Sequence, residues 1–225
     1  MREVVEKKVL SENDRLAAEL RQRYRDQNIL CVNLISSPGS GKTALLEKTL
    51  ASLPKNNSVA VLTGDIQTDN DARRLAQYAF PVRQIVTGGT CHLDARMIDR
   101  HLNQLGFRGP GLLLVENVGN LICPSSYDLG EAAKIVLLSV TEGEDKPLKY
   151  PGIFHRASLM ILTKTDLLPH VDFKPELALE NARKVHPDIE YIALSSRTGE
   201  NFDKWLDWLN ALQQKVQHEA AAINS

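Results

Sequence analysis

The sequence has few aromatic residues and only three cysteines. Phe, Trp and Tyr make up 5% of the 225 residues. The three cysteines are an odd number, and the opening segment MREVVEKKVL lacks the apolar stretch of a signal peptide, so we expect reduced thiols and no disulfide framework. Cys31 lies inside the apolar run ILCVNLI, where a small thiol is typical of a core residue. That leaves Cys91 and Cys123 as the cysteines with possible chemistry.

The sequence also lacks a strong net charge and a long apolar run. Its 27 basic and 28 acidic residues give a formal charge of −1, whereas nucleic-acid binding normally uses a positive field. No apolar run approaches the roughly 20 residues that span a bilayer. We therefore expect no nucleic-acid partner, no membrane association and a cytoplasmic location.

Short apolar runs separated by helical stretches are what the sequence does contain. Because the runs are nearly all apolar rather than alternating, each predicted strand should be buried on both faces, as in a parallel sheet flanked by helices. The sequence therefore predicts an α/β fold with a doubly wound, mostly parallel sheet, whose ligands bind at the carboxyl ends of the strands. The predicted strands are 29–35, 59–63, 82–86, 112–116, 135–140, 159–163 and 189–194.

Three segments are expected along the chain. Residues 1–28 are charged, with scattered leucines, and predict a helical lead-in. Residues 29–215 hold all of the apolar runs and predict a single domain with one core. Residues 216–225 end in small and polar side chains and predict a flexible tail.

A phosphate-binding loop follows the first predicted strand. Residues 36–43 read SSPGSGKT and lead into the helical stretch ALLEKTLASL, which is the strand, loop and helix order that the GxxxxGK[ST] motif requires. Ser36 stands where this consensus has glycine. Lys42 would reach the β and γ phosphates, and Thr43 would hold Mg²⁺. The loop backbone that would surround the phosphates is expected to come from Gly39, Ser40, Gly41 and Ala44.

Two carboxylates follow other predicted strands and should share this edge of the sheet. Asp65 ends the run VAVLTGD, and Glu116 ends the run GLLLVE. Together with Lys42 they are the predicted catalytic and Mg²⁺-binding groups, and Gly119 could offer its N–H to a γ-phosphate. The alternative is that Asp65, or Asp69 farther on, caps the following helix. No single side chain stands out as the base that activates water.

A second motif predicts that the base is guanine. Residues 163–166 read TKTD and resemble the [NT]KxD motif of GTPases, in which Asp166 would accept hydrogen bonds from guanine N1–H and its 2-amino group. Adenine has neither donor there. Lys164 would cover the base with its stem. Ser195 and Arg197, in SSRTG, resemble the segment that braces guanine in these enzymes.

A possible transition-metal site is formed by Cys91, His92 and Cys123. Thiolate and imidazole suit Zn²⁺ or Ni²⁺. Three ligands do not complete a tetrahedral structural site, so water, a neighbouring residue or a second subunit would have to contribute. The alternative, a helix start that carries a buried thiol, stays open at this point.

Taken together, these segments resemble one known family. SSPGSGKT, GDIQTDNDA, TCHLDA, ENVGNLICP, EGEDKPLKYP and TKTDLLP are similar to HypB, the GTPase family of nickel–iron hydrogenase maturation, over residues 5–215. The resemblance implies a doubly wound α/β fold, GTP-promoted homodimerisation, and a Ni²⁺ or Zn²⁺ site at Cys91, His92 and Cys123 shared across the dimer. It also implies a HypA-like nickel chaperone as partner, for which residues 9–26 are a candidate docking surface, and a hydrogenase large-subunit precursor as final client.

The resemblance makes a GTP-hydrolysing metallochaperone the predicted function. The Cys-rich and His-rich nickel motifs of some family members are missing from this sequence, so metal handling should depend on the GTPase-domain site. Because Cys123 lies four residues past Gly119, GTP hydrolysis could change metal affinity. Two alternatives stay open: an ATP-using enzyme of the kinase type, and a regulatory GTPase that handles no metal. Lys146, in EGEDKPLKYP, could approach a nucleotide base.

Overall fold

The computed structural model describes residues 2–66 and 70–223, and this part of the chain contains one seven-stranded sheet. The strand order is β3-β2-β4-β1-β5-β6-β7, and every neighbouring pair is parallel. The predicted parallel α/β sheet is thus confirmed. The strands are β1 (Ile29–Ser36), β2 (Val59–Asp65), β3 (Val82–Val86), β4 (Gly111–Glu116), β5 (Ala133–Ser139), β6 (Leu159–Thr163) and β7 (Glu190–Ala193).

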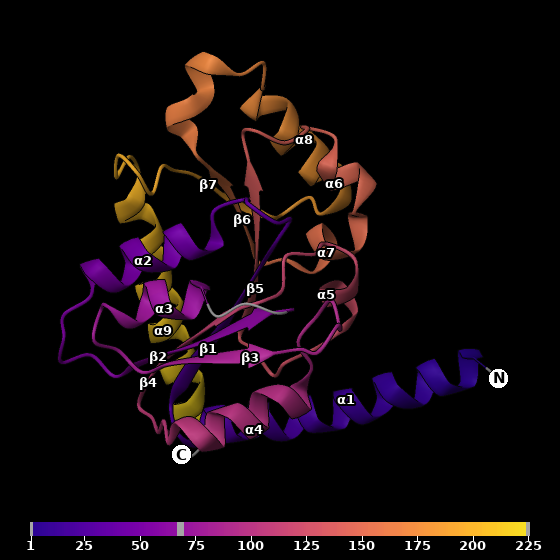
Figure 1. Ribbon diagram of the computed structural model, residues 1–225, viewed down its shortest axis with the longest axis vertical. Helices are drawn as coiled ribbons and strands as arrows, with labels where there is room; N and C mark the ends of the chain where they lie inside the picture. Colours follow the sequence, from indigo (N-terminus) through magenta and orange to yellow (C-terminus); the bar gives the residue numbers. More distant parts are fainter. Residues whose placement is uncertain (1, 67–69, 224–225) are drawn as a thin grey trace.

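Helices cover both faces of the sheet (Figure 1). Helices α2, α3 and α9 pack on one face, while α1, α4, α7 and α8 pack on the other. Crossovers on both faces are the definition of a doubly wound sheet, and its ligands lie where the strands end. The helices are α1 (Arg2–Asp26), α2 (Lys42–Ser52), α3 (Asn70–Ala76), α4 (Ala95–Leu105), α5 (Cys123–Ser126), α6 (Lys146–Lys149), α7 (Pro151–Arg156), the 3-10 helix η1 (Thr165–His170), α8 (Pro175–Val185) and α9 (Phe202–Ile223).

The central strands place alternate side chains in the two halves of the core. In β1, Leu30 packs in the cluster with α2 and α9, whereas the fully buried Cys31 packs in the cluster with α1 and α4. Cys31 is therefore a core residue, as predicted. The expectation that every strand is buried on both faces is wrong for the sheet edges: Val86 of β3 and Glu190 of β7 are exposed. Each edge strand has a neighbour on one side only, so fewer atoms cover it.

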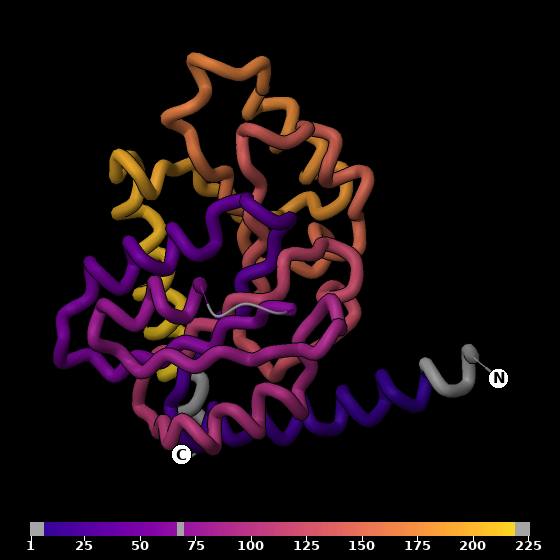
Figure 2. The backbone as a smooth tube through the Cα atoms, viewed as in Figure 1, coloured from indigo at the N-terminus to yellow at the C-terminus, as the bar shows by residue number. Residues whose placement is uncertain are grey.

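Both ends of the described chain join the core through helices. Helix α1 packs through Ala17, Leu20 and Tyr24, and the outer part of α1 that Figure 2 draws in indigo extends past α4 and beyond the sheet. Helix α9 passes through residue 216, where the flexible tail was expected to begin, and continues to Ile223. Val216 of α9 is partly buried and packs against the core cluster that holds Trp205 and Leu209. Residues 224 and 225 lie outside the described part.

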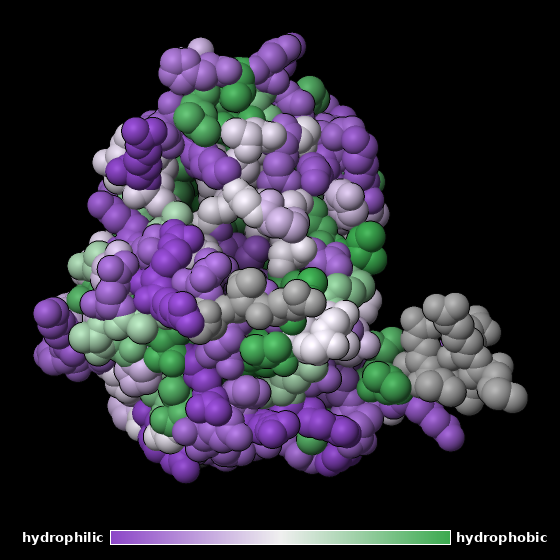
Figure 3. Space-filling view, in the orientation of Figure 1, coloured by the Kyte–Doolittle hydropathy of each residue, from purple (hydrophilic) through white to green (hydrophobic). Residues whose placement is uncertain are grey.

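The surface seen in Figure 3 is mainly hydrophilic, and its apolar side chains occur in small groups. Among residues 2–66 and 70–223, none of the helices has the length and apolar content needed to cross a bilayer.

Candidate functional site

The phosphate loop joins β1 to α2 over the carboxyl end of the sheet. Gly39 (φ 74°) and Gly41 (φ 96°) have left-handed backbones, which glycine adopts without strain. Gly41 is also the N-cap of α2, and no side chain caps this helix end. The first N–H groups of α2 therefore remain available to an anion, and the helix dipole favours negative charge there.

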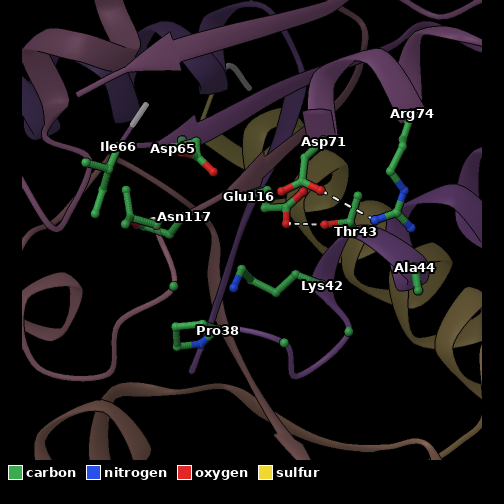
Figure 4. Close-up of a pocket in the computed structure, with 15 residues that line it drawn as sticks. Pro38, Lys42, Thr43, Ala44, Asp65, Ile66, Asp71, Arg74, Glu116 and Asn117 are labelled. Atoms are coloured by element: carbon green, nitrogen blue, oxygen red, sulfur yellow. Dashed lines mark hydrogen bonds and ion pairs between the residues drawn. The ribbon is translucent and has the colours of Figure 1, made fainter. Parts of the chain in front are cut away.

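Lys42 and Thr43, at the start of α2, point into a cavity of about 430 Å³ at the centre of the strand ends (Figure 4). Lys42 Nζ donates a hydrogen bond of 2.8 Å to Ser36 Oγ, so the residue that departs from the consensus holds the lysine. Burial of the ammonium lowers the pKa of Lys42. The Thr43 hydroxyl donates to Glu116 Oε1 at 2.8 Å. Predicted residues from two distant segments thus meet in one cavity.

Glu116 is a buried carboxylate whose pKa is raised by its position in the cavity. It is 3% exposed, and its Oε2 has no hydrogen-bond partner among the described residues. Burial raises its pKa to about 7, although Lys42 and the Thr43 hydroxyl act in the opposite direction. Asp65 lines the same cavity. A buried carboxylate oxygen without a partner, beside a hydroxyl and a second carboxylate, is a donor set that fits Mg²⁺.

Replacing Glu116 by Gln should remove a pH dependence of the stability of the nucleotide-free and Mg²⁺-free protein. The native pKa of about 7 lies above the ordinary 4.5, so the folded state keeps a proton that the unfolded state releases. The free energy of unfolding therefore falls as pH rises from about 4.5 to about 7, by roughly 3 kcal/mol for this group. Urea unfolding of the native protein and of Glu116→Gln across this range measures the difference. Parallel pH profiles would contradict the assignment.

The predicted guanine-reading segments also come together. Ser195 Oγ donates to Asp166 Oδ1 at 2.6 Å, and Arg197 Nη1 lies 3.9 Å from Asp166 Oδ2. Lys164 Nζ donates to the Gly39 carbonyl at 2.7 Å, so its stem runs back toward the phosphate loop. Thr163 Oγ1 donates to the Ser40 carbonyl at 2.7 Å. The TKTD segment and the phosphate loop therefore form one continuous wall.

Cys91, His92 and Cys123 form a second cluster, whose side-chain atoms could bind a metal ion and all lie within 4.8 Å of one another. The two Sγ atoms are 2.7 Å apart, and the hydrogen bond to Cys91 raises the pKa of Cys123. The His92 ring stacks on Tyr127 with a centroid distance of 3.7 Å. Burial lowers the pKa of His92, and its buried Nδ1 has no partner within the described part of the chain. A neutral imidazole and two thiols are a donor set for Ni²⁺ or Zn²⁺.

The sequence and the fold of this chain match those of known proteins. The family model described as the CobW/HypB/UreG nucleotide-binding domain matches residues 30–193. The hydrogenase maturation factor HypB of Azotobacter chroococcum mcd 1 is 53% identical over 205 residues, which cover 91% of this chain and 67% of that protein. The chain belongs to the HypB family. The HypB protein of Escherichia coli K12 is 52% identical over 205 residues, covering 91% of this chain and 71% of that protein.

A solved HypB structure has the same fold. The crystal structure of HypB from Helicobacter pylori in complex with nickel superposes with a TM-score of 0.84 at 40% identity, over 91% of this chain and 96% of that one. The resemblance inferred from the motifs is therefore confirmed, as is the nucleotide-binding P-loop fold.

Two charged residues that line this HypB nucleotide cavity were not predicted from the sequence. Asp71 and Arg74 of α3 line the cavity beside Glu116 (Figure 4). Arg74 forms a two-pronged ion pair with Glu47 of α2, with Nε–Oε1 of 3.0 Å and Nη2–Oε2 of 2.6 Å, and it lies 3.5 Å from Asp71. The only signal in the sequence was the dense charge of IQTDNDARR. Asp69, the alternative cap, lies outside the described residues.

Lys146 lies against the phosphate loop of this HypB domain. Its Nζ donates to Ser37 Oγ at 3.1 Å and is 3.1 Å from Glu142 Oε2. Glu142 Oε1 in turn accepts from Ser40 Oγ at 2.7 Å. Lys146, the first residue of α6, therefore lies in the wall of the nucleotide site.

Proposed function

We propose that this HypB-family protein hydrolyses GTP and uses its nucleotide state to control a nickel or zinc site during hydrogenase maturation. The observation that carries the proposal is the position of Cys123, four residues beyond Gly119 of the nucleotide cavity and within ligand distance of Cys91 and His92. Membership of the HypB family and the nickel named for the Helicobacter pylori structure support it.

For hydrolysis, the residues predicted from the sequence each have a proposed role. Lys42 would neutralise the β and γ phosphates, and the backbone N–H groups of Gly39, Ser40, Gly41 and Ala44 would bind their oxygens. Thr43, Asp65 and Glu116 would hold Mg²⁺, which supplies positive charge to the phosphates when bound. The Gly119 N–H would contact the γ-phosphate, so its loop would respond to hydrolysis.

For base selection, Asp166 would accept two hydrogen bonds from guanine, with Lys164 over the base and Ser195 and Arg197 bracing the carboxylate. Replacing Asp166 by Asn should weaken GTP binding roughly 100-fold or more, because hydrogen bonds to a charged partner contribute about 1.5–3 kcal/mol each. The Asn amide would instead donate to the extra carbonyl of xanthine, so affinity for XTP should rise. Calorimetric titration with GTP, XTP and ATP measures the change.

The exposed Asp172, next to the same segment, supplies the matched control. Asp172→Asn removes one carboxylate at the same change in net charge and should leave GTP affinity within about twofold, as for surface substitutions in general. Unchanged GTP affinity in Asp166→Asn, or ATP binding as strong as GTP binding in the native chain, would favour the ATP-using alternative.

For metal delivery, we propose a site shared by two copies of the chain. Cys91, His92 and Cys123 supply three ligands, one fewer than a closed tetrahedral site. A second copy facing this cluster would complete the coordination, so GTP-promoted homodimerisation would assemble the site. The proposed partners are a HypA-like nickel chaperone and a hydrogenase large-subunit precursor, and the proposed location is the cytoplasm.

Metal titration in two nucleotide states tests the proposal. Ni²⁺ and Zn²⁺ are titrated into the purified chain with GDP and with a non-hydrolysable GTP analogue, while light scattering records the mass in solution. One ion per dimer, with affinity that differs between the nucleotides, is the expected result. If the metal affinity and the mass in solution are the same with GDP and with the GTP analogue, the protein is a GTPase without nucleotide-controlled metal handling.

A further inference from the structure

Asn117 lies at the junction between the nucleotide cavity and the metal ligands. Its side chain, 1% exposed, accepts two backbone hydrogen bonds on one oxygen. Oδ1 is 3.0 Å from the Val118 nitrogen, in its own loop, and 3.1 Å from the Leu93 nitrogen, directly after His92. One buried oxygen thus joins the loop that follows β4 to the segment that carries two metal ligands.

The loop end of this junction rests on the phosphate loop. A Cβ at Gly119 would lie 3.0 Å from Pro38 Cγ and 3.1 Å from Pro38 Cα, so the backbones approach as closely as glycine permits. Pro38, Val118 and Gly119 all line the nucleotide cavity. A phosphate that inserts between Pro38 and Gly119 must therefore shift the loop, and Val118 N–H is bound to the same oxygen as Leu93 N–H.

At the other end of the junction, Leu93 and His92 are closely packed against their neighbours. The Leu93 side chain is fully buried, and it lies so close to Gly64 that a Cβ there would be 2.8 Å from Leu93 Cγ. The neighbouring His92 ring is stacked on Tyr127. Because packed interiors do not deform continuously, a displacement of the Leu93 backbone changes where His92 and Cys91 lie.

A chain of buried polar side chains connects Asn117 to the segment that carries Tyr127, on which the His92 ring stacks. Asn117 Nδ2 donates to Asn33 Oδ1 at 3.2 Å, and Asn33 Nδ2 donates to Glu131 Oε1 at 3.1 Å. Glu131 Oε2 accepts from the Leu129 nitrogen at 2.6 Å, two residues from Tyr127. We call Asn117, Asn33 and Glu131 the amide relay. Burying a polar group costs free energy unless its hydrogen-bond partners are present. The relay therefore favours one geometry for the two neighbours of His92, which are the Leu93 backbone and the Tyr127 ring.

We propose that Asn117 is a positioning residue that transmits nucleotide state to the metal ligands through the Leu93 backbone, with the amide relay as its anchor. The inference rests on the proposed function, because it needs a metal site that responds to nucleotide. It names the atoms that would carry this response: Asn117 Oδ1, shared between Val118 N–H and Leu93 N–H. The amide relay would stay in place while the loop that contains Val118 and Gly119 moves.

The test compares the native chain with Asn117→Ala at saturating GDP and at a saturating non-hydrolysable GTP analogue. Ni²⁺ affinity is measured in each state, and the ratio of the two affinities is the readout. Couplings between sites are typically about 5- to 150-fold; the native ratio should lie in this range, and the ratio of Asn117→Ala should fall to within about twofold of unity. The matched control is Asn181→Ala, which removes a similarly buried asparagine that donates to the Glu144 carbonyl and should keep the native ratio.

The outcomes separate the two ideas. A native ratio of one overturns the proposed coupling, and the inference with it. A native ratio that persists in Asn117→Ala overturns the inference alone. Hydrogen exchange of residues 87–99 in the metal-free native chain gives a second measurement that needs no variant: the Leu93 amide should exchange at different rates in the two nucleotide states, and equal rates would reject the role of Asn117.

Discussion

Replacing Lys42 by Ala should reduce kcat/KM for GTP by roughly 10²- to 10³-fold, the usual effect of removing one preorganised donor from a charged transition state. Lys42 is 7% exposed and is held by Ser36, so its ammonium is already positioned where phosphate charge would lie. No other lysine lines the cavity among the described residues. Phosphate release under single-turnover conditions, with and without Mg²⁺, measures the loss.

Lys55→Ala is the matched control, because Lys55 is exposed in the turn after α2 and is not among the residues that line the cavity. It should retain native hydrolysis. Loss of hydrolysis in both variants would point to a general effect of charge or stability, and retention in both would remove Lys42 from the proposed mechanism.

Replacing Cys91 or Cys123 by Ala should each lower Ni²⁺ affinity by more than about 100-fold, since even changes to the partners of metal ligands cost roughly 10- to 100-fold. The two Sγ atoms and the His92 ring converge within 4.8 Å, so loss of either thiol leaves two ligands. Equilibrium competition with a chromophoric chelator measures the affinity, and thiolate-to-metal absorption bands report whether sulfur remains bound.

The third cysteine provides the control for this prediction. Cys31 is fully buried in the core next to α1 and α4, so Cys31→Ala should lower stability by less than about 2 kcal/mol and leave metal affinity unchanged. If Cys91→Ala and Cys123→Ala bind Ni²⁺ as tightly as Cys31→Ala does, the cluster is not the metal site.

The features that depend on neighbours in the sequence could be predicted well. The apolar run before the phosphate loop has the length of a buried strand. The glycines of the loop precede Lys42 at the spacing that a phosphate loop needs. Predicted strands 82–86 and 159–163 agree with β3 and β6 at both ends. Other strand ends moved by one or two residues, because pairing with a neighbour, which sequence does not specify, decides where a strand stops.

The features that depend on strand order could not be predicted in the same way. Cys91 follows β3 and Cys123 follows β4, and β2 lies between these two strands in the sheet. Motif spacing suggested that the thiols belong together, but only the order β3-β2-β4 brings the two loops over one strand end. Asp71 and Arg74 escaped notice for a related reason, because their role depends on how α3 packs beside α2.

Asn33 was not among the residues predicted from the sequence to have a role. It is the one polar side chain inside the run ILCVNLI, and a polar group in a strand buried on both faces must find a hydrogen-bond partner. That signal was present in the sequence, but its partners Asn117 and Glu131 are 84 and 98 residues away. Only the parallel pairing of β1 with β4 and β5 brings them into contact.

The sequence by itself determined the fold class, the phosphate loop and the family, and it supplied the TKTD motif on which the prediction of guanine binding rests, because each of these is encoded in short runs of neighbouring residues. The tertiary structure decided how these parts are connected. It brought Glu116 into hydrogen-bond contact with Thr43, Asp166 with Ser195, and Asn117 with the Leu93 backbone N–H. Contacts between such distant segments follow from strand order and helix packing, which are set by the burial of the whole core.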